Sequence, residues 1–310
     1  MNPYLKNVSR IEFSVTHRCQ GRCRHCALGT DRTAGELTPE MAVAALEDAY
    51  EACSLLSVRT FGGEPLLCVP TVCALHQRAE ALDVHSRELI TSGCFTHDRA
   101  LRAYTADRLE ASGVNVILLS VDAFHSEHLP LRGQYGFARD LCAAGLGSAT
   151  TLHPAWIDGL RGRNPYDRET VALLSRFEPL RLPVGEGNRV FPGGSAAVHL
   201  FGYFEQKPLD MDFQCGTTAY TQRLDAPTAL AVDPDGSVRV CGFAIGNLHR
   251  QTMAAILKGY DPYRYAPMRA LLEQGISGLI TFAAQQGITV RPEACASPCA
   301  LCRSVSRQLQ

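Results

Sequence analysis

The sequence predicts an α/β fold, a partial (β/α)6 barrel followed by a smaller cysteine-rich domain, and three observations lead to it. The chain has 310 residues, 46% hydrophobic and 20% charged, so it can bury a large core without disulfides. Between about residues 10 and 200, short β-rich runs alternate with amphipathic helical stretches. After residue 200 this alternation stops, and aromatic loops and a second group of cysteines follow. We therefore expect a barrel over 1–200 and a second domain over 201–310.

Six β-rich runs predict the strands of the barrel. They are Ile11–Thr16, Ser57–Phe61, Glu88–Thr91, Val114–Val121, Ala149–Leu152 and Leu180–Val184. Parallel strands joined by helical crossovers of one hand curl into an open barrel. In such barrels the chemistry collects at the C-terminal ends of the strands, so we look for site residues in the loops that follow them.

The clearest helix follows the first strand. Thr38 is the expected N-cap and Pro39 the first helical residue, and the apolar residues after them recur at helical spacing to about Cys53. Further helices are expected at Pro70–Leu82, Asp98–Ser112, Tyr135–Ala144 and Tyr166–Arg176, and beyond the barrel near Met253–Leu257 and Pro267–Gly287. Between the two groups, Asp233-Pro-Asp-Gly236 predicts a β-hairpin.

Charge and hydropathy exclude several classes of protein. The 30 basic and 31 acidic residues leave a net charge of -1, without the basic excess expected of a nucleic-acid or membrane-surface binder. The polar start of the chain contains no apolar secretion segment, and Val114–Val121, the longest apolar run, is too short to cross a bilayer. We expect a cytoplasmic protein with neither nucleic acid nor membrane as its partner.

Thirteen cysteines are the composition's main anomaly. In a reducing compartment, clustered cysteines bind metal or do redox chemistry, whereas scattered ones are mostly small buried apolar residues. Five are scattered, and we expect them to be packing residues: Cys53, Cys68, Cys73, Cys94 and Cys142.

Three cysteines lie in one loop directly after the first strand, in the run Cys19-Gln-Gly-Arg-Cys23-Arg-His-Cys26. Three thiolates on one loop can hold three corners of a 4Fe-4S cluster and leave the fourth iron without a protein ligand. An open metal position is one that binds substrate. The alternative is a zinc site completed by His25 or by a distant ligand.

The second strand ends in Phe61-Gly62-Gly63-Glu64-Pro65. Two adjacent glycines let the backbone approach a ligand closely, and Glu64 can bind a cation or buttress the loop. Taken alone, the glycine pair is equally typical of an ordinary turn.

Together, the two motifs resemble those of the radical S-adenosylmethionine (radical SAM) superfamily, over most of residues 10–200. The resemblance implies a TIM-like partial barrel in which Cys19, Cys23 and Cys26 bind a 4Fe-4S cluster and SAM chelates its open iron. It also implies that Gly62, Gly63, Glu64 and Pro65 form the segment that binds the SAM amino group.

Two positions depart from the family pattern: His25 replaces the usual aromatic residue, where it can still stack on adenine, and Gln20 replaces a frequent Asn. Two short segments match the family pattern less closely, namely Thr91-Ser92-Gly93 and Ser120-Val-Asp122. The resemblance implies that Ser92, Ser120 and Asp122 lie at the cofactor. The implied chemistry is reductive cleavage of SAM to a 5'-deoxyadenosyl radical that abstracts hydrogen. It requires a flavodoxin- or ferredoxin-type electron donor.

The second group of cysteines consists of Cys215, Cys241, Cys295, Cys299 and Cys302. One interpretation is a zinc ribbon built from Cys241 and the closing Cys-x2-Cys. The layout also resembles the SPASM/twitch extensions of the radical SAM superfamily, which carry auxiliary 4Fe-4S clusters. This resemblance implies one auxiliary cluster on Cys215, Cys241, Cys299 and Cys302, with Cys295 either replacing Cys215 or remaining a free thiol nearby.

Asp122 and His125, with His128 nearby, follow the fourth strand and are the candidates for an acid or base at the substrate. The same residues equally fit the start of a helix, with Asp122 or Ser126 as its cap.

The resemblance to SPASM/twitch enzymes implies a natural-product enzyme that oxidises, epimerises or cross-links a peptide of the RiPP-precursor type. The alternative substrate is a small natural-product intermediate. A hypothesis of another class is a structural metal-binding or electron-carrier protein.

Overall fold

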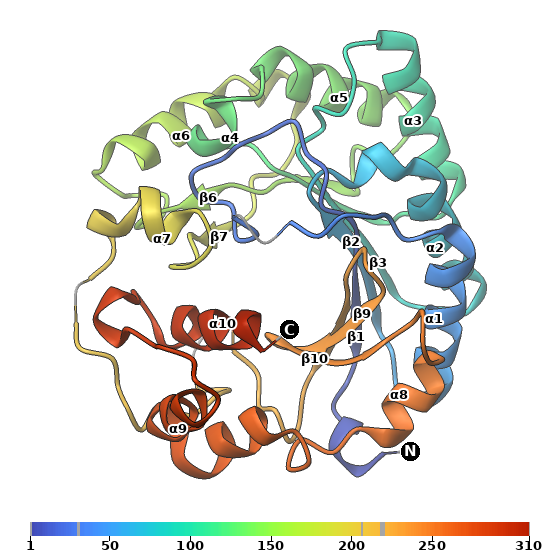
Figure 1. The fold of residues 1–310 in the computed structure, drawn as a ribbon. Coiled ribbons are helices and arrows are strands. Elements are labelled where there is room, and N and C mark those ends of the chain that lie inside the picture. The colour runs from blue at the N-terminus through green and yellow to red at the C-terminus, as the bar shows by residue number, and fades with distance from the viewer. Residues whose placement is uncertain (1, 30–31, 206, 218–220, 310) are drawn as a thin grey trace.

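A computed structural model describes residues 2–29, 32–205, 207–217 and 221–309 of the chain (Figure 1). Its centre is one eight-stranded sheet with the order β10-β9-β8-β1-β2-β3-β4-β5. The strands are β1 (Arg10–Thr16), β2 (Ser57–Gly62), β3 (Ser86–Thr91), β4 (Val116–Leu119), β5 (Thr150–Leu152), β8 (Ala229–Val232), β9 (Ser237–Val240) and β10 (Phe243–Asn247). From β8 to β5 all neighbours are parallel, which confirms the predicted α/β fold with a largely parallel, curved sheet.

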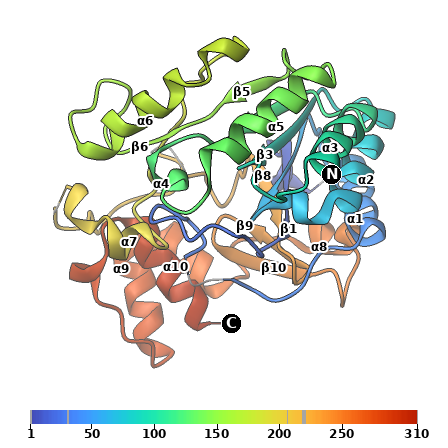
Figure 2. The ribbon, with the colours of Figure 1, turned by 90° about the horizontal axis from the view of Figure 1, so that it is seen from above.

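Helices follow the barrel strands and cover the outside of the sheet (Figures 1 and 2). They are α1 (Pro39–Ala52), α2 (Val69–Ala81), α3 (Arg99–Ala111), α5 (Leu131–Ala143) and α6 (Pro165–Ser175), with the short α4 (Ala123–Ser126) and α7 (Ala196–His199) between them. Thr38 caps α1 as predicted, because its hydroxyl accepts from the Met41 N–H at 3.2 Å. Helix α5 begins at Leu131, four residues earlier than the sequence pattern indicated.

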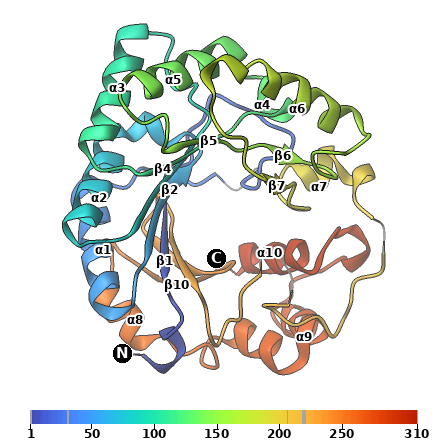
Figure 3. The same ribbon diagram turned by 180° about the vertical axis from the view of Figure 1, so that it is seen from behind.

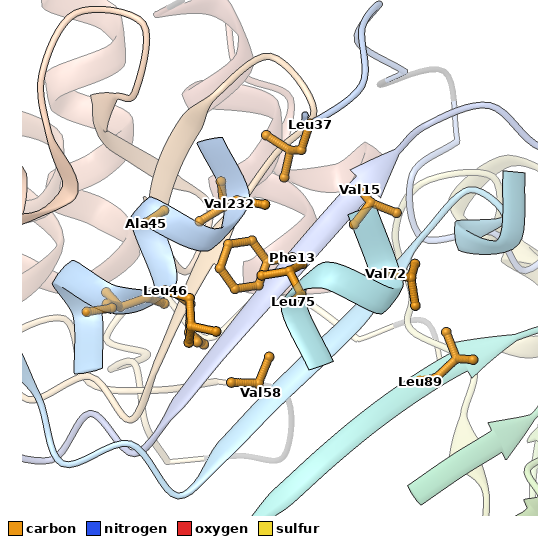
Figure 4. Packing of buried hydrophobic residues seen from close by; sticks show 14 of the residues in the cluster. Phe13, Val15, Leu37, Ala45, Leu46, Val58, Val72, Leu75, Leu89 and Val232 are labelled. Carbon is orange, nitrogen blue, oxygen red and sulfur yellow. The ribbon is translucent and has the colours of Figure 1, made fainter. Parts of the chain in front are cut away.

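The core lies between the parallel strands and helices α1 and α2 (Figure 4). Phe13 and Val15 of β1 are fully buried, and the leucines of both helices pack toward the strand. Ile11, Phe13 and Val15 alternate along β1 with more polar residues, and this period of two is what locates the strand in the sequence. The burial of its last four residues is unbroken, so Ser14 and Thr16 are buried as well.

The predicted sixth strand at Leu180–Val184 is wrong. Residues Glu178–Leu180 form a 3-10 turn, and Arg181 has a left-handed φ of +53°. Pro183 has no N–H to donate, so the segment makes only one parallel bridge, between Val184 and Leu152. Next to it, β6 (Ala155–Trp156) and β7 (Asn188–Arg189) form a small parallel sheet of their own.

The chain after residue 200 returns to the central sheet. Strand β8 pairs in parallel with β1, and β9 and β10 continue as antiparallel strands. The predicted hairpin is confirmed: Gly236 adopts φ +77° in the turn, and Asp233 and Ser237 hydrogen-bond across it. These strands thus extend the barrel sheet, and the boundary between residues 200 and 201 stays a prediction.

Three more helices complete this part: α8 (Met253–Gly259), α9 (Ala266–Gln285) and α10 (Pro298–Gln308). Helix α8 packs beside α1, and α10 lies across from α7 (Figures 1 and 3). Within the described ranges, no helix has the length and apolar character needed to cross a bilayer.

Of the scattered cysteines, four are buried as predicted, namely Cys53, Cys68, Cys73 and Cys94. Cys142 is only half-buried.

Candidate metal centres

The cysteine loop leaves the C-terminal end of β1, with Cys23 buried and Cys19 and Cys26 half-buried. Gly21 shapes the space between two of the thiols. A Cβ atom added to Gly21 would lie 3.1 Å from Cys23 Sγ and 3.6 Å from Cys19 Sγ, so these sulfur atoms converge on a cradle that a larger residue would fill. The Gly21 N–H donates to Cys19 Sγ at 3.3 Å, the kind of contact that stabilises a thiolate ligand. The donor set and the cradle fit an iron-sulfur cluster.

The glycine pair after β2 brings that strand against this loop. The Gly63 N–H donates to Thr16 O at 2.7 Å, and the Glu64 N–H donates to Arg18 O at 2.8 Å. A Cβ on Gly62 would lie 2.3 Å from Thr16 O, and one on Gly63 would lie 2.1 Å from Arg18 O. Only glycine allows this approach, so the pair holds the end of β2 beside the cysteine loop.

Glu64 is fully buried and ties three segments together. Its Oε1 accepts from the Leu66 N–H at 3.1 Å and from the Thr91 hydroxyl at 2.6 Å. Its Oε2 accepts from the N–H and the hydroxyl of Ser92, at 3.0 and 2.6 Å. Of the two roles that the sequence left open for Glu64, the contacts among described residues are those of a buttress between the ends of β2 and β3.

We expect Glu64→Gln to lower the free energy of unfolding by roughly 2–3 kcal/mol, because a buried donor left without an acceptor costs that order. Each carboxylate oxygen accepts one backbone N–H, so either orientation of the glutamine amide turns an NH2 toward a backbone donor. Urea denaturation measures the loss. Glu51→Gln, at an exposed position of α1, is the matched control and should change the value by less than about 0.5 kcal/mol. Equal stability of both variants would contradict the buttress role.

A second polar group lies after β4. Asp122 is buried and caps α4 by accepting from the His125 N–H, and its carboxylate also contacts His125 Nδ1 at 2.8 and 2.9 Å. Burial alone would raise the pKa of Asp122, but His125 outweighs it and holds that pKa well below the ordinary value. Conversely, Asp122 raises the pKa of His125 against the effect of burial. The expected cap is therefore present, together with a direct contact between the carboxylate and the imidazole.

His25 connects this pair to the cysteine loop. Its ring lies 4.7 Å from the His125 ring and 4.9 Å from the Phe124 ring, centroid to centroid. Burial lowers the pKa of His25 to about 4, so the ring is neutral at physiological pH. Its buried Nδ1 has no hydrogen-bond partner within the described structure, so a polar atom is left for a bound molecule. Ser120 lies beside the group, where its carbonyl accepts from Gln134 Nε2 at 2.6 Å.

Four of the five C-terminal cysteines come together in space. They reach the site from a loop before β8 (Cys215), from the β9–β10 turn (Cys241) and from one face of α10 (Cys299 and Cys302). Burial, with Cys241 and Cys299 as neighbours, raises the pKa of Cys215 to about 12. Burial and the other three thiols together raise the pKa of Cys302.

Cys295 is apart from this group. Its pKa is raised by burial and by Glu293, without a contribution from the other cysteines. Its Sγ donates to Arg291 O at 3.5 Å, and the residue lines a cavity of 710 Å³ between α7 and α10.

The same cavity adjoins the first cysteine loop. Ser195, in its wall, donates its N–H to Cys26 O at 2.9 Å. Arg303, another lining residue, lies between the two cysteine sets, within electrostatic reach of both Cys26 and Cys241. The cavity therefore borders the first cysteine loop, and one residue of its wall, Arg303, is near both cysteine sets.

One further group of metal-binding side chains lies in the described ranges. His25, Asp122 and His125 place one possible ligand atom each within 4.8 Å of one another.

A parallel α/β barrel with three cysteines after its first strand and a glycine pair after its second defines a class, and comparison with known proteins agrees with it. Residues 13–141 match the model of the Radical SAM superfamily. The chain therefore carries a radical SAM domain.

Curated relatives are distant and longer. The GTP 3',8-cyclase of Desulforamulus reducens is 24% identical over 200 residues, 60% of this chain and 59% of that protein. The GTP 3',8-cyclase 2 of Pseudomonas aeruginosa is 29% identical over 136 residues, 41% of this chain and 37% of that protein. The match thus spans less than two thirds of these relatives' own length.

Two solved structures have a similar fold. The structure of Streptococcus suis SuiB bound to the precursor peptide SuiA covers 88% of this chain and 71% of that one, with a TM-score of 0.57 and 11% identity. The structure of anSMEcpe with bound AdoMet and a Kp18Cys peptide covers 82% of this chain and 81% of that one, with a TM-score of 0.51 and 12% identity. At these identities the likeness concerns the fold alone.

Proposed function

We propose that the chain is a radical SAM enzyme that cleaves S-adenosylmethionine reductively and abstracts hydrogen from a peptide substrate. The observation that carries the proposal is the cradle at Gly21, on which the thiols of Cys19 and Cys23 converge beside the glycine pair of β2. Cys19, Cys23 and Cys26 would hold a 4Fe-4S cluster, which supplies the electron that breaks the sulfonium bond of SAM.

The remaining site residues position and enclose the cofactor. Gly62 and Gly63 keep the end of β2 at the cysteine loop, Pro65 begins the 3-10 turn that follows, and Glu64 holds Ser92 in place there. His25 offers a neutral ring and a free buried nitrogen to the adenine of SAM. A surrounding wall that excludes water is needed because a carbon radical attacks whatever it meets.

The pair of Asp122 and His125 serves this proposal as a proton donor or acceptor. The carboxylate keeps His125 protonated to a higher pH than a free imidazole would remain. Because the pair also closes the start of α4, its structural role is compatible with the catalytic one.

A second 4Fe-4S cluster is proposed on Cys215, Cys241, Cys299 and Cys302, in an extension of the SPASM/twitch type. Four thiolates close such a cluster to further ligands, so its use is to pass electrons. We assign the cavity between α7 and α10 to the substrate, because it borders the first cysteine loop and its lining residue Arg303 is near both cysteine sets. The thirteen free cysteines accord with a cytoplasmic location.

Two observations bear on the substrate. Two proteins of similar fold were solved with peptides, the SuiA precursor peptide and the Kp18Cys peptide, and this supports peptide modification by oxidation, epimerisation or cross-linking. The names of the curated relatives favour a small molecule as the second candidate.

The test is anaerobic reconstitution with iron and sulfide, followed by dithionite and SAM. We expect 5'-deoxyadenosine as a product, detected by mass spectrometry. Its absence from fully iron-loaded protein would contradict the enzyme and favour an electron carrier. A short open reading frame beside the gene, supplied as a synthetic peptide, would distinguish the two substrate classes through a mass change of the peptide.

A further inference from the structure

Helices α3 and α5 lie side by side on the outside of the barrel (Figures 1 and 3). A hollow of 810 Å³ is lined by residues of these two helices and of the loops before them, together with Arg176. Its lining is strongly basic. It contains His97 and five arginines, namely Arg99, Arg102, Arg132, Arg139 and Arg176. In the described structure, no acidic side chain lines it. For a protein with a net charge of -1, this is a marked local concentration of positive charge.

Two of the arginines share one carboxylate, that of Asp140. Arg102 is buried and forms an ion pair with Asp140, in a space left open because Gly136 has no side chain. Arg139 contacts the same carboxylate at 3.3 Å. This pair joins α3 to α5 and makes the floor of the hollow rigid.

The other three arginines face solvent. Arg99, Arg132 and Arg176 are exposed, and within the described residues none has an acidic partner. Folding gains nothing from gathering three unpaired like charges on one surface, because like charges repel one another. Their positions therefore need an explanation outside the fold.

The hollow borders the first cysteine loop. Gln20 of that loop donates through Nε2 to Phe95 O at 3.1 Å, and the next residue, Thr96, lines the hollow. On the α5 side, the Leu129 side chain lies 3.5 Å from the Cβ position of Gly21, and its neighbour Pro130 lines the hollow. A molecule seated here would be separated from the cysteine loop by one layer of residues.

We infer that this hollow is the docking site of the protein electron donor, a small acidic flavin protein of the flavodoxin kind. The inference rests on the proposed function, which needs such a donor. In the complex the reduced flavin gives up one electron to the radical SAM site and becomes a semiquinone, and no other group is transferred.

Three features favour an acidic protein over a bound small anion. The unpaired arginines are exposed and come from α3, α5 and the end of α6, so they are spread over a broad surface. Transient redox complexes use small interfaces and depend on charge complementarity for fast encounter. An electron donor benefits from a site beside the cysteine loop, whereas a free phosphate gains nothing from that position.

The experiment measures binding, not only turnover. Oxidised flavodoxin is titrated into the reconstituted protein by calorimetry at low and at high salt. We expect Arg99→Glu/Arg132→Glu to weaken the affinity by about tenfold or more at low salt and to flatten the salt dependence. Both positions lie in the first turns of helices, where glutamate is well tolerated.

The matched control is Arg168→Glu/Arg269→Glu, which makes the same charge change at exposed positions of α6 and α9. It should bind flavodoxin as the wild type does. Equal loss in both double variants, or none in either, would overturn the docking site. The docking site would also be overturned if ATP or pyrophosphate bound in the hollow while flavodoxin bound elsewhere. Cleavage of SAM with dithionite must persist in Arg99→Glu/Arg132→Glu; if even the wild type lacks it, the proposed function has failed instead.

Discussion

Replacing Cys19, Cys23 and Cys26 together by alanine is expected to abolish 5'-deoxyadenosine formation and to remove about half of the iron. With two 4Fe-4S clusters the protein holds about eight iron atoms, and the loss of one cluster leaves about four. The loss should be complete for activity because all three thiols that the proposal assigns to the first cluster are removed together. Iron analysis and mass spectrometry of the dithionite reaction measure the two effects separately.

The matched control replaces three cysteines that the structure buries in the core: Cys53, Cys68 and Cys73. Changing each of them to alanine removes as much sulfur and touches neither centre, so iron and activity should remain. If the first triple variant produced as much 5'-deoxyadenosine as the wild type, the enzyme proposal would be wrong. If the wild type carried zinc in place of iron, both cluster proposals would be wrong.

The sequence pattern predicts most of the barrel because its signals are local. Thr38 and Pro39 begin α1 through contacts within one turn, and the alternation of apolar and more polar residues along β1 is a pattern of period two. Leu180–Val184 has the composition of a strand, but Pro183 and the left-handed Arg181 prevent the pairing, and a pattern of hydrophobicity does not register these.

Contacts between segments that are distant in the chain could not be predicted from the sequence. The pairing of β8 with β1 depends on the closure of a loop of over two hundred residues, and no periodicity carries that information. The same holds at the site. The sequence placed His25 and His125 in separate loops, and only the fold shows their rings in contact. Gly194 is a further residue that the sequence analysis missed. A Cβ atom added to it would collide with Cys26 O, so this glycine lets the cavity wall lie against the cysteine loop.

Replacing two of the four C-terminal cysteines is the second change from which we expect a large loss of iron. Cys241→Ala/Cys302→Ala is expected to lose the other half of the iron and still to form 5'-deoxyadenosine with dithionite. Two of four ligands are removed, and a cluster does not survive on the remaining pair, while Cys19, Cys23 and Cys26 are unchanged. Modification of the substrate should stop, because the electron that must leave or enter the substrate loses its carrier.

Cys295→Ala provides the control within the same segment. This thiol lies on the cavity wall and bonds to Arg291 O, apart from the other four, so its variant should retain all of the iron. Loss of about four iron atoms in Cys295→Ala, with none lost in Cys215→Ala, would reverse the ligand assignment. A wild-type protein that already holds only about four iron atoms would remove the auxiliary cluster altogether. The cavity would then have one redox centre on its border instead of two, and the substrate's electron would have to return to the cluster from which it came.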